Sequence, residues 1–141
     1  MKKLILLLFV LFAFVGCNEN GAATEDENYP RIVPDVIISD RFFPQQVSEI
    51  YMNPSIYLGQ IIQLQGLFIT ETWQGEYFHA VAQVVPSCCS PDGLMGFEIL
   101  LDGKDPFEER AWVEFTGVLE EDADGILVLR ALQIIEADEP A

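Results

Sequence analysis

The chain has 141 residues, half of them hydrophobic, and carries 23 acidic side chains against 7 basic ones, a formal net charge of −16. A chain this acidic repels phosphate backbones, and so few cations cannot build the basic groove that nucleic-acid binding requires. The same charge gains nothing from an anionic lipid surface. Composition therefore excludes a nucleic-acid-binding protein and a purely electrostatic membrane attachment.

Residues 1–16, MKKLILLLFVLFAFVG, are typical of a signal peptide. Lys2 and Lys3 precede an uninterrupted apolar run over residues 4–15. That run is about 18 Å long as a helix, which is too short for a bilayer core of roughly 30 Å. We therefore expect a leader that is removed and not a membrane-spanning helix.

Gly16 and Cys17 end the apolar run in a way that resembles the lipobox of bacterial lipoproteins, although Phe14 stands where the usual pattern has Leu. The resemblance implies that Cys17 is lipidated and that its acyl chains hold the protein on a membrane. Asn18 follows the cysteine, where Asp would imply retention at the inner membrane. We expect a lipid-anchored protein of the bacterial cell envelope, on the periplasmic face of the outer membrane if the organism has one. An ordinary secretory signal with a chance cysteine is the alternative.

Two further regions follow the leader. Residues 17–34 are polar, acidic and interrupted by Pro30 and Pro34, so they are expected to form an acylated, flexible tether. Residues 35–137 have enough apolar content for one domain with a single core.

A short helix is predicted at PQQVSEIYMNP, where Phe43, Val47, Ile50 and Tyr51 recur at the spacing of one helical face. Pro44 suits the first turn of a helix, and Asn53-Pro54 is a stop signal. We expect this helix to pack on a sheet.

Five β-strands are predicted after the helix, from alternating apolar residues and from β-branched and aromatic enrichment. They cover residues 59–70, 76–86, 94–101, 111–120 and 126–135.

The predicted fold class is all-β, a small five-stranded barrel resembling an OB-fold with a short N-terminal helix. Gly66 and Gly117 lie within the first and fourth strands, where a barrel needs sharp bends. The segment DGKDPFEER separates the third and fourth strands, as a connecting segment does in an OB-fold. An open β-sandwich of similar strands is the alternative.

Cys88 and Cys89 are the most unusual feature of the chain, since they stand side by side in the turn-forming sequence PSCCSPDG. Consecutive Cα atoms lie about 3.8 Å apart, below the usual disulfide range of roughly 4.4–6.8 Å. A disulfide between neighbours would be strained and easily reduced. A loop can instead direct both sulfur atoms to one point.

The two thiolates, Asp92 and His79 together form a candidate metal site for a thiophilic ion such as zinc or Cu(I). The alternative is structural: one cysteine buried as a small hydrophobic residue and the other an incidental surface thiol. His79 could equally serve packing alone, and Asp92 could equally stabilise the turn.

Several segments together resemble the extracytoplasmic C-terminal domain of the YcgQ-type permease-subunit family. The resemblance covers about residues 46–135, and the paired cysteines are its most specific element. It implies an association with an integral-membrane permease and a link to metal-ion handling. That family carries transmembrane helices before the domain, where this chain has a lipoprotein signal. The matching elements are Asn53-Pro54, Tyr57-Leu58-Gly59, Cys88-Cys89 with Asp92, Gly96-Phe97, and Trp112-Val113 through Gly117.

Two functions are expected from these features. The first is a binding module that holds or transfers a metal ion through the vicinal cysteines. The second is an interaction or assembly protein that docks on a permease and has no metal site. We do not expect an enzyme, because the chain has one histidine, no CxxC, no glycine-rich phosphate loop and no HExxH motif.

Overall fold

The computed structural model describes residues 31–86 and 93–140. A compact unit begins at Ile32. Its long strands match the five predicted ones to within a few residues, and one short strand, β1, was not predicted. The elements are β1 (Val36–Ile37), the 3-10 helix η1 (Asp40–Phe42), α2 (Phe43–Met52), α3 (Pro54–Tyr57), β2 (Ile61–Trp73), β3 (Glu76–Val85), β4 (Gly93–Leu100), β5 (Trp112–Glu121) and β6 (Leu127–Glu136).

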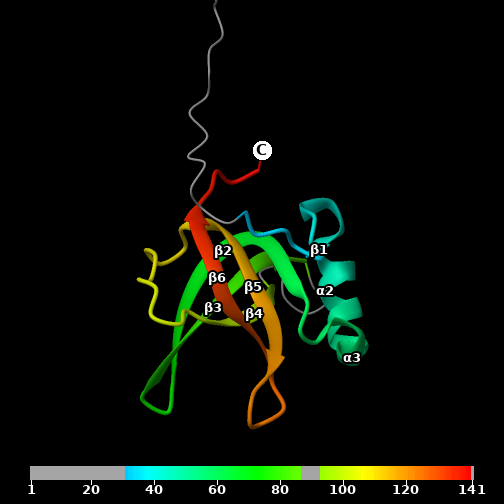
Figure 1. The fold of residues 1–141 in the computed structure, drawn as a ribbon. Coiled ribbons are helices and arrows are strands. Elements are labelled where there is room, and N and C mark those ends of the chain that lie inside the picture. Colours follow the sequence, from blue (N-terminus) through cyan, green and yellow to red (C-terminus); the bar gives the residue numbers. More distant parts are fainter. Residues whose placement is uncertain (1–30, 87–92, 141) are drawn as a thin grey trace, which may run out of the picture. The chain divides into compact units, whose positions relative to one another are not determined.

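The five long strands close into a barrel (Figure 1). Neighbours run in the order β2, β3, β4, β6, β5, and β5 pairs back with β2. All of these pairs are antiparallel except β4 with β6, which is parallel. This five-stranded barrel with a crossed connection is the arrangement of an OB-fold. The prediction of an all-β, OB-like barrel with a short helix is confirmed.

Closure depends on strand β2 changing partners halfway along its length. Residues Ile61–Leu67 of β2 pair with β5, and residues Leu67–Trp73 pair with β3. Gly66 stands at this change, where a Cβ atom would lie 2.7 Å from the carbonyl oxygen of Ala82. In β5, a register shift against β6 falls between Thr116 and Gly117. Both glycines predicted to allow bends therefore stand where a strand changes its pairing partner or its register.

Helix α2 packs on the barrel beside β4. Its Phe43, Val47 and Ile50 are buried in the core, as their spacing predicted. Tyr51 stacks on Phe97 with ring centroids 5.1 Å apart, and its hydroxyl donates a hydrogen bond to the carbonyl oxygen of Gly96 at 3.0 Å. The helix ends at Met52 before Asn53-Pro54, although a second short helix, α3, starts at Pro54.

The barrel interior is filled by large apolar side chains from every long strand. This core is continuous with the buried face of α2. None of the helices that the structure describes is long and apolar enough to cross a membrane. The largest fully buried side chains include Phe43, Phe68, Phe97, Phe115, Ile50, Ile62, Leu64, Leu119 and Leu129.

Candidate functional site

The predicted metal ligands are divided between described and undescribed parts of the chain. Cys88, Cys89 and Asp92, together with the lipidation residue Cys17, lie outside the described residues. Their proposed roles stay predictions. The structure does place the two strands that they connect, since the ends of β3 and β4 pair with each other at Val85 and Gly93.

His79 lies in the middle of β3, between Thr70 of β2 and Ile99 of β4. Its Nδ1 is 3.1 Å from the hydroxyl oxygen of Thr70, and its ring stacks on Phe68 with centroids 5.2 Å apart. Val85, the last residue of β3, is six residue steps away, which is about 20 Å along a strand. Its role as a metal ligand remains a prediction, and its described contacts are those of a packing residue.

Within residues 31–86 and 93–140, no group of three or more His, Cys, Asp or Glu side chains is placed to hold a metal ion. Among the described residues, aromatic and acidic side chains instead line a cleft between two hairpins.

The β2–β3 and β5–β6 hairpins project from the same end of the barrel, as Figure 1 shows. The first turns at Gln74 and Gly75, both with positive φ (52° and 87°), so a two-residue turn links Trp73 directly to Glu76. In the second, one carboxylate oxygen of Asp122 accepts hydrogen bonds from the backbone N–H groups of Asp124 (2.9 Å) and Ile126 (2.8 Å). Both tips are therefore held by local turn chemistry.

A cleft of about 330 Å³ lies between these two hairpins, and we call it the hairpin cleft. Side chains from four different segments meet in it: the end of β2, the start of β3, the middle of β4 and the β5–β6 turn. It is lined by Trp73, Glu76, Tyr77, Phe78, Glu98, Asp122, Asp124 and Ile126.

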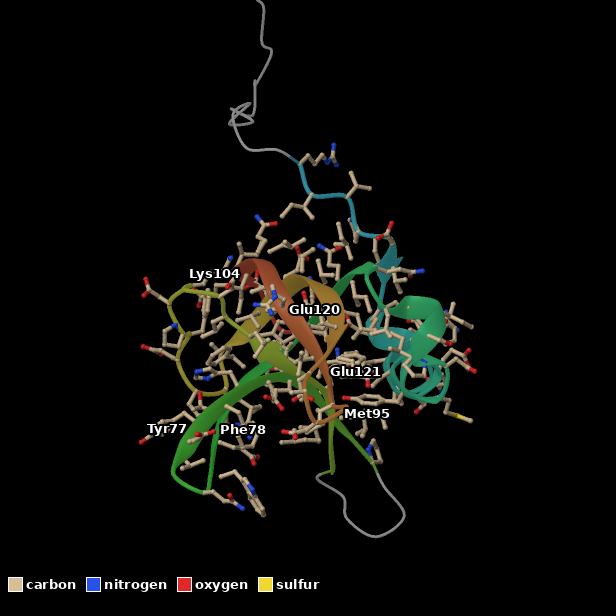
Figure 2. All side chains as sticks on the ribbon, turned by 60° about the horizontal axis from the view of Figure 1, so that its bottom comes forward. Tyr77, Phe78, Met95, Lys104, Glu120 and Glu121 are labelled. Atoms are coloured by element: carbon tan, nitrogen blue, oxygen red, sulfur yellow. The ribbon has the colours of Figure 1, made fainter. Side chains whose placement is uncertain are left out.

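Two of the aromatic side chains of the cleft are open to solvent. Trp73 is 69% exposed and Tyr77 is 76% exposed. Tyr77 and Phe78 lie on the β2–β3 hairpin and can be followed in Figure 2. Large exposed aromatic rings grouped at one site are characteristic of binding surfaces, because they supply contact area at little conformational cost.

A shallow groove of about 200 Å³ continues from the cleft over the outer face of β2, β3 and β4. It shares Phe78 and Glu98 with the cleft. Its floor is apolar, and two of its residues, Ile69 and Ala82, are more than 90% buried without belonging to the barrel core. The groove is lined by Ile69, Glu71, Phe78, Ala80, Ala82, Leu94, Gly96, Phe97 and Glu98.

All charged residues that line the cleft and the groove are acidic. The cleft contributes Glu76, Glu98, Asp122 and Asp124, and the groove adds Glu71. Burial raises the pKa of Tyr51 above its usual 10.0, and the negative charge of the nearby Glu98 raises it further. The charge of Glu98 is therefore felt outside the groove as well. The site is therefore electronegative as well as aromatic.

This site was not predicted from the sequence. One signal was present: the hairpin sequence ETWQGEYF combines three aromatic residues with two acidic ones around a glycine turn. Its remaining carboxylates come from β4 and the β5–β6 turn, which are distant in the chain and whose approach depends on barrel closure.

Comparison with family models matches residues 19–140 to the DUF1980 C-terminal domain. The chain belongs to this family. The match confirms the predicted resemblance at the level of the domain family, because this is the YcgQ-type domain. Membership of the DUF1980 family is in keeping with a membrane-associated or envelope protein, and it assigns no activity.

Among solved structures, this DUF1980 domain is similar to the N-terminal domain of PriB from Thermoanaerobacter tencongensis, which is described as dimeric. The two share 23% sequence identity with a TM-score of 0.35, over 56% of this chain and 97% of that one. No curated protein matches the chain.

Proposed function

We propose that this DUF1980 protein is a lipid-anchored protein of the bacterial envelope whose barrel is a non-catalytic binding module. The observation that carries the proposal is the hairpin cleft, a binding-sized space between two hairpins whose lining includes the exposed residues Trp73 and Tyr77. In OB-folds the corresponding loops and the outer face of the second and third strands are the usual place for ligands. Here that face is formed by β3 and β4.

Membrane attachment is supported by the sequence around Cys17. An acylated Cys17 leaves fourteen residue steps to Arg31, where the described chain begins. Fully extended, such a tether reaches about 50 Å, enough for the barrel to meet the extracytoplasmic part of a membrane protein. Mass spectrometry of the protein extracted from membranes tests this. A diacylglyceryl mass on Cys17 is expected, and an unmodified N-terminus at any other residue would contradict it.

Site-specific photo-crosslinking tests the binding module itself. A photoreactive side chain at Tyr77 is expected to yield a discrete adduct in intact cells. The matched control position is Glu136, an exposed residue at the end of β6, which lies at the opposite end of the barrel from the hairpins. Equal labelling from both positions, or none from Tyr77, would refute the assignment of the cleft as the binding face.

An integral-membrane permease is the partner class that the family resemblance supports. Mapping the peptides in the Tyr77 adduct identifies the partner. Adducts confined to soluble envelope proteins would refute a permease association and leave the binding module in place.

Metal binding is a second candidate function, supported by the adjacent Cys88 and Cys89 between β3 and β4 and by the nearby Asp92. The reduced, purified protein is expected to bind one Zn²⁺ or Cu(I), and a Cys88→Ser/Cys89→Ser variant is expected to lose it. Equal metal content in the two proteins would end this proposal. A His79→Ala variant separates the histidine from the cysteine pair, because a ligand role requires a weaker metal affinity in that variant.

A further inference from the structure

We infer that the hairpin cleft and its groove recognise a cationic, extended polypeptide segment of a partner protein. Lysine or arginine side chains of that segment would bind the carboxylates and aromatic rings of the cleft, and its backbone would follow the groove. This inference rests on the proposed binding function and names its ligand class.

Charge is the first argument. Glu76, Glu98, Asp122 and Asp124 line the cleft from three different elements, and no described lysine, arginine or histidine lines it with them. Cation-rich ligands would be steered toward such a site, while nucleic acids and other polyanions would be repelled. The net charge of −16 reinforces this selection at long range.

The pairing of carboxylates with exposed aromatic rings is the second argument. Trp73 and Glu76 are directly opposite each other at the hairpin tip, so their side chains leave the same face of the sheet. Glu71 and Phe78 form the next pair on that face. An ammonium or guanidinium group can contact a carboxylate and a ring face together, and Trp is the strongest cation–π partner.

The shape of the groove is the third argument, and it favours an extended chain over a small cation. Ala80 and Ala82 have small side chains and Gly96 has none, which leaves room along the floor, and Ala82 and Gly96 are paired across β3 and β4. From Glu76 to Val84 the face runs eight residue steps along β3, about 26 Å. That length matches a segment of about eight extended residues.

A metal ion is the weaker alternative for this surface. No group of three potential ligands is close enough to hold one within the two described stretches of chain. One oxygen of Asp122 is also already engaged by the backbone of its own turn.

The test is a fluorescence-polarisation titration of the full-length protein in mild detergent with labelled eight-residue peptides. One peptide alternates Lys and Ala, and the other alternates Glu and Ala. The Lys-Ala peptide is expected to bind, with an affinity that falls as salt rises. The Glu-Ala peptide is expected not to bind. Equal binding of both peptides would overturn the inference. So would the absence of Lys-Ala binding at about 50 mM salt, where exposed charges are only partly screened.

Variants separate the cleft from the general acidity of the protein. Trp73→Ala with Tyr77→Ala is expected to weaken Lys-Ala binding about tenfold. A variant with Trp73→Phe and Tyr77→Ala, which keeps an aromatic ring at position 73, is expected to lose less affinity. Glu98→Gln with Asp124→Asn is also expected to cost about tenfold. The control, Glu136→Gln with Glu139→Gln, changes the net charge equally at exposed residues outside the cleft and should cost less than twofold.

Equal losses in the acidic variant and its control would overturn the inference, because they would show attraction to the whole protein and not to the cleft. If a neutral oligosaccharide binds and the Lys-Ala peptide does not, the inference of a cationic polypeptide ligand is wrong. A Tyr77 cross-link to a partner without Lys-Ala binding would preserve the proposed function and refute the cationic ligand. Urea unfolding of each variant confirms that the comparison is between folded proteins.

Discussion

Gly96 offers a direct test of how closely the strands under the groove are packed. It pairs with Ala82 across β3 and β4. A Cβ atom added to Gly96 would overlap the carbonyl oxygen of Val81 and lie 2.6 Å from the Cα and 2.8 Å from the Cβ of Ala82. Two of these three atoms are backbone, and β3 is held on both sides by β2 and β4. Relief of the overlap therefore requires the strands to separate.

The cost of Gly96→Ala follows from this geometry. Overpacking a well-packed interior costs about 1–3 kcal/mol, and more where only backbone can move. We expect a loss of about 3 kcal/mol, a large part of the roughly 5–15 kcal/mol typical of a domain. With a urea slope of about 1–3 kcal/mol/M, the unfolding midpoint should fall by at least about 1 M.

Gly59→Ala is the matched control for this measurement. Gly59 has φ +82°, and its added Cβ would meet no atom within 4 Å. The control therefore carries only the backbone strain of a left-handed alanine, about 1–2 kcal/mol. If Gly96→Ala destabilises the protein no more than Gly59→Ala does, the close approach of β3 and β4 inferred here is wrong.

Two further predictions concern titratable contacts on the barrel. Tyr51→Phe removes the hydrogen bond to the Gly96 carbonyl but keeps the stacking on Phe97, so urea unfolding at neutral pH should show a loss of about 0.5–1.5 kcal/mol. The pKa of Tyr51 is raised by burial and by Glu98, so its stabilising effect is full below pH 10.0 and is lost as pH rises through the folded pKa. The wild type should thus lose more stability than Tyr51→Phe above pH 10.0, and parallel curves would argue against this contact. The pKa of Glu120 is lowered chiefly by its hydrogen bonds to Arg130, so its contribution is present above pH 4.5 and declines as pH falls. In Glu120→Gln, the free energy of unfolding measured in urea should therefore fall less steeply with decreasing pH than in the wild type. An unchanged pH dependence would show that the pair of Glu120 and Arg130 contributes nothing measurable.

The secondary structure was predicted well because each signal is local. In β2, Ile62, Leu64 and Phe68 alternate in the sequence and are all buried in the structure. Helix α2 was recognisable from Pro44 and from its apolar spacing. The two-residue strand β1 was missed, since two residues are too few for any periodic pattern to appear.

The hairpin cleft was not predicted because its parts are distant in the sequence. The cysteine pair stood out as a motif, whereas the aromatic residues of ETWQGEYF resembled an ordinary hairpin. Alternation could assign the side chains of β3 to two faces but could not tell which face was inside. Burial of Val81 answers that question and places Phe78 and Ala80 on the outer groove.

The sequence by itself determined the leader-like N-terminus, the excess of negative charge, the five long strands and the glycines that let them bend. These are properties of composition and of neighbouring residues, which a chain carries before it folds. Only the tertiary structure decided that β5 returns to β2 and that the two hairpins border a cleft lined by four carboxylates. Strand pairing over long sequence separations depends on the closure of the whole barrel, and the periodicity of a single strand does not specify its partner.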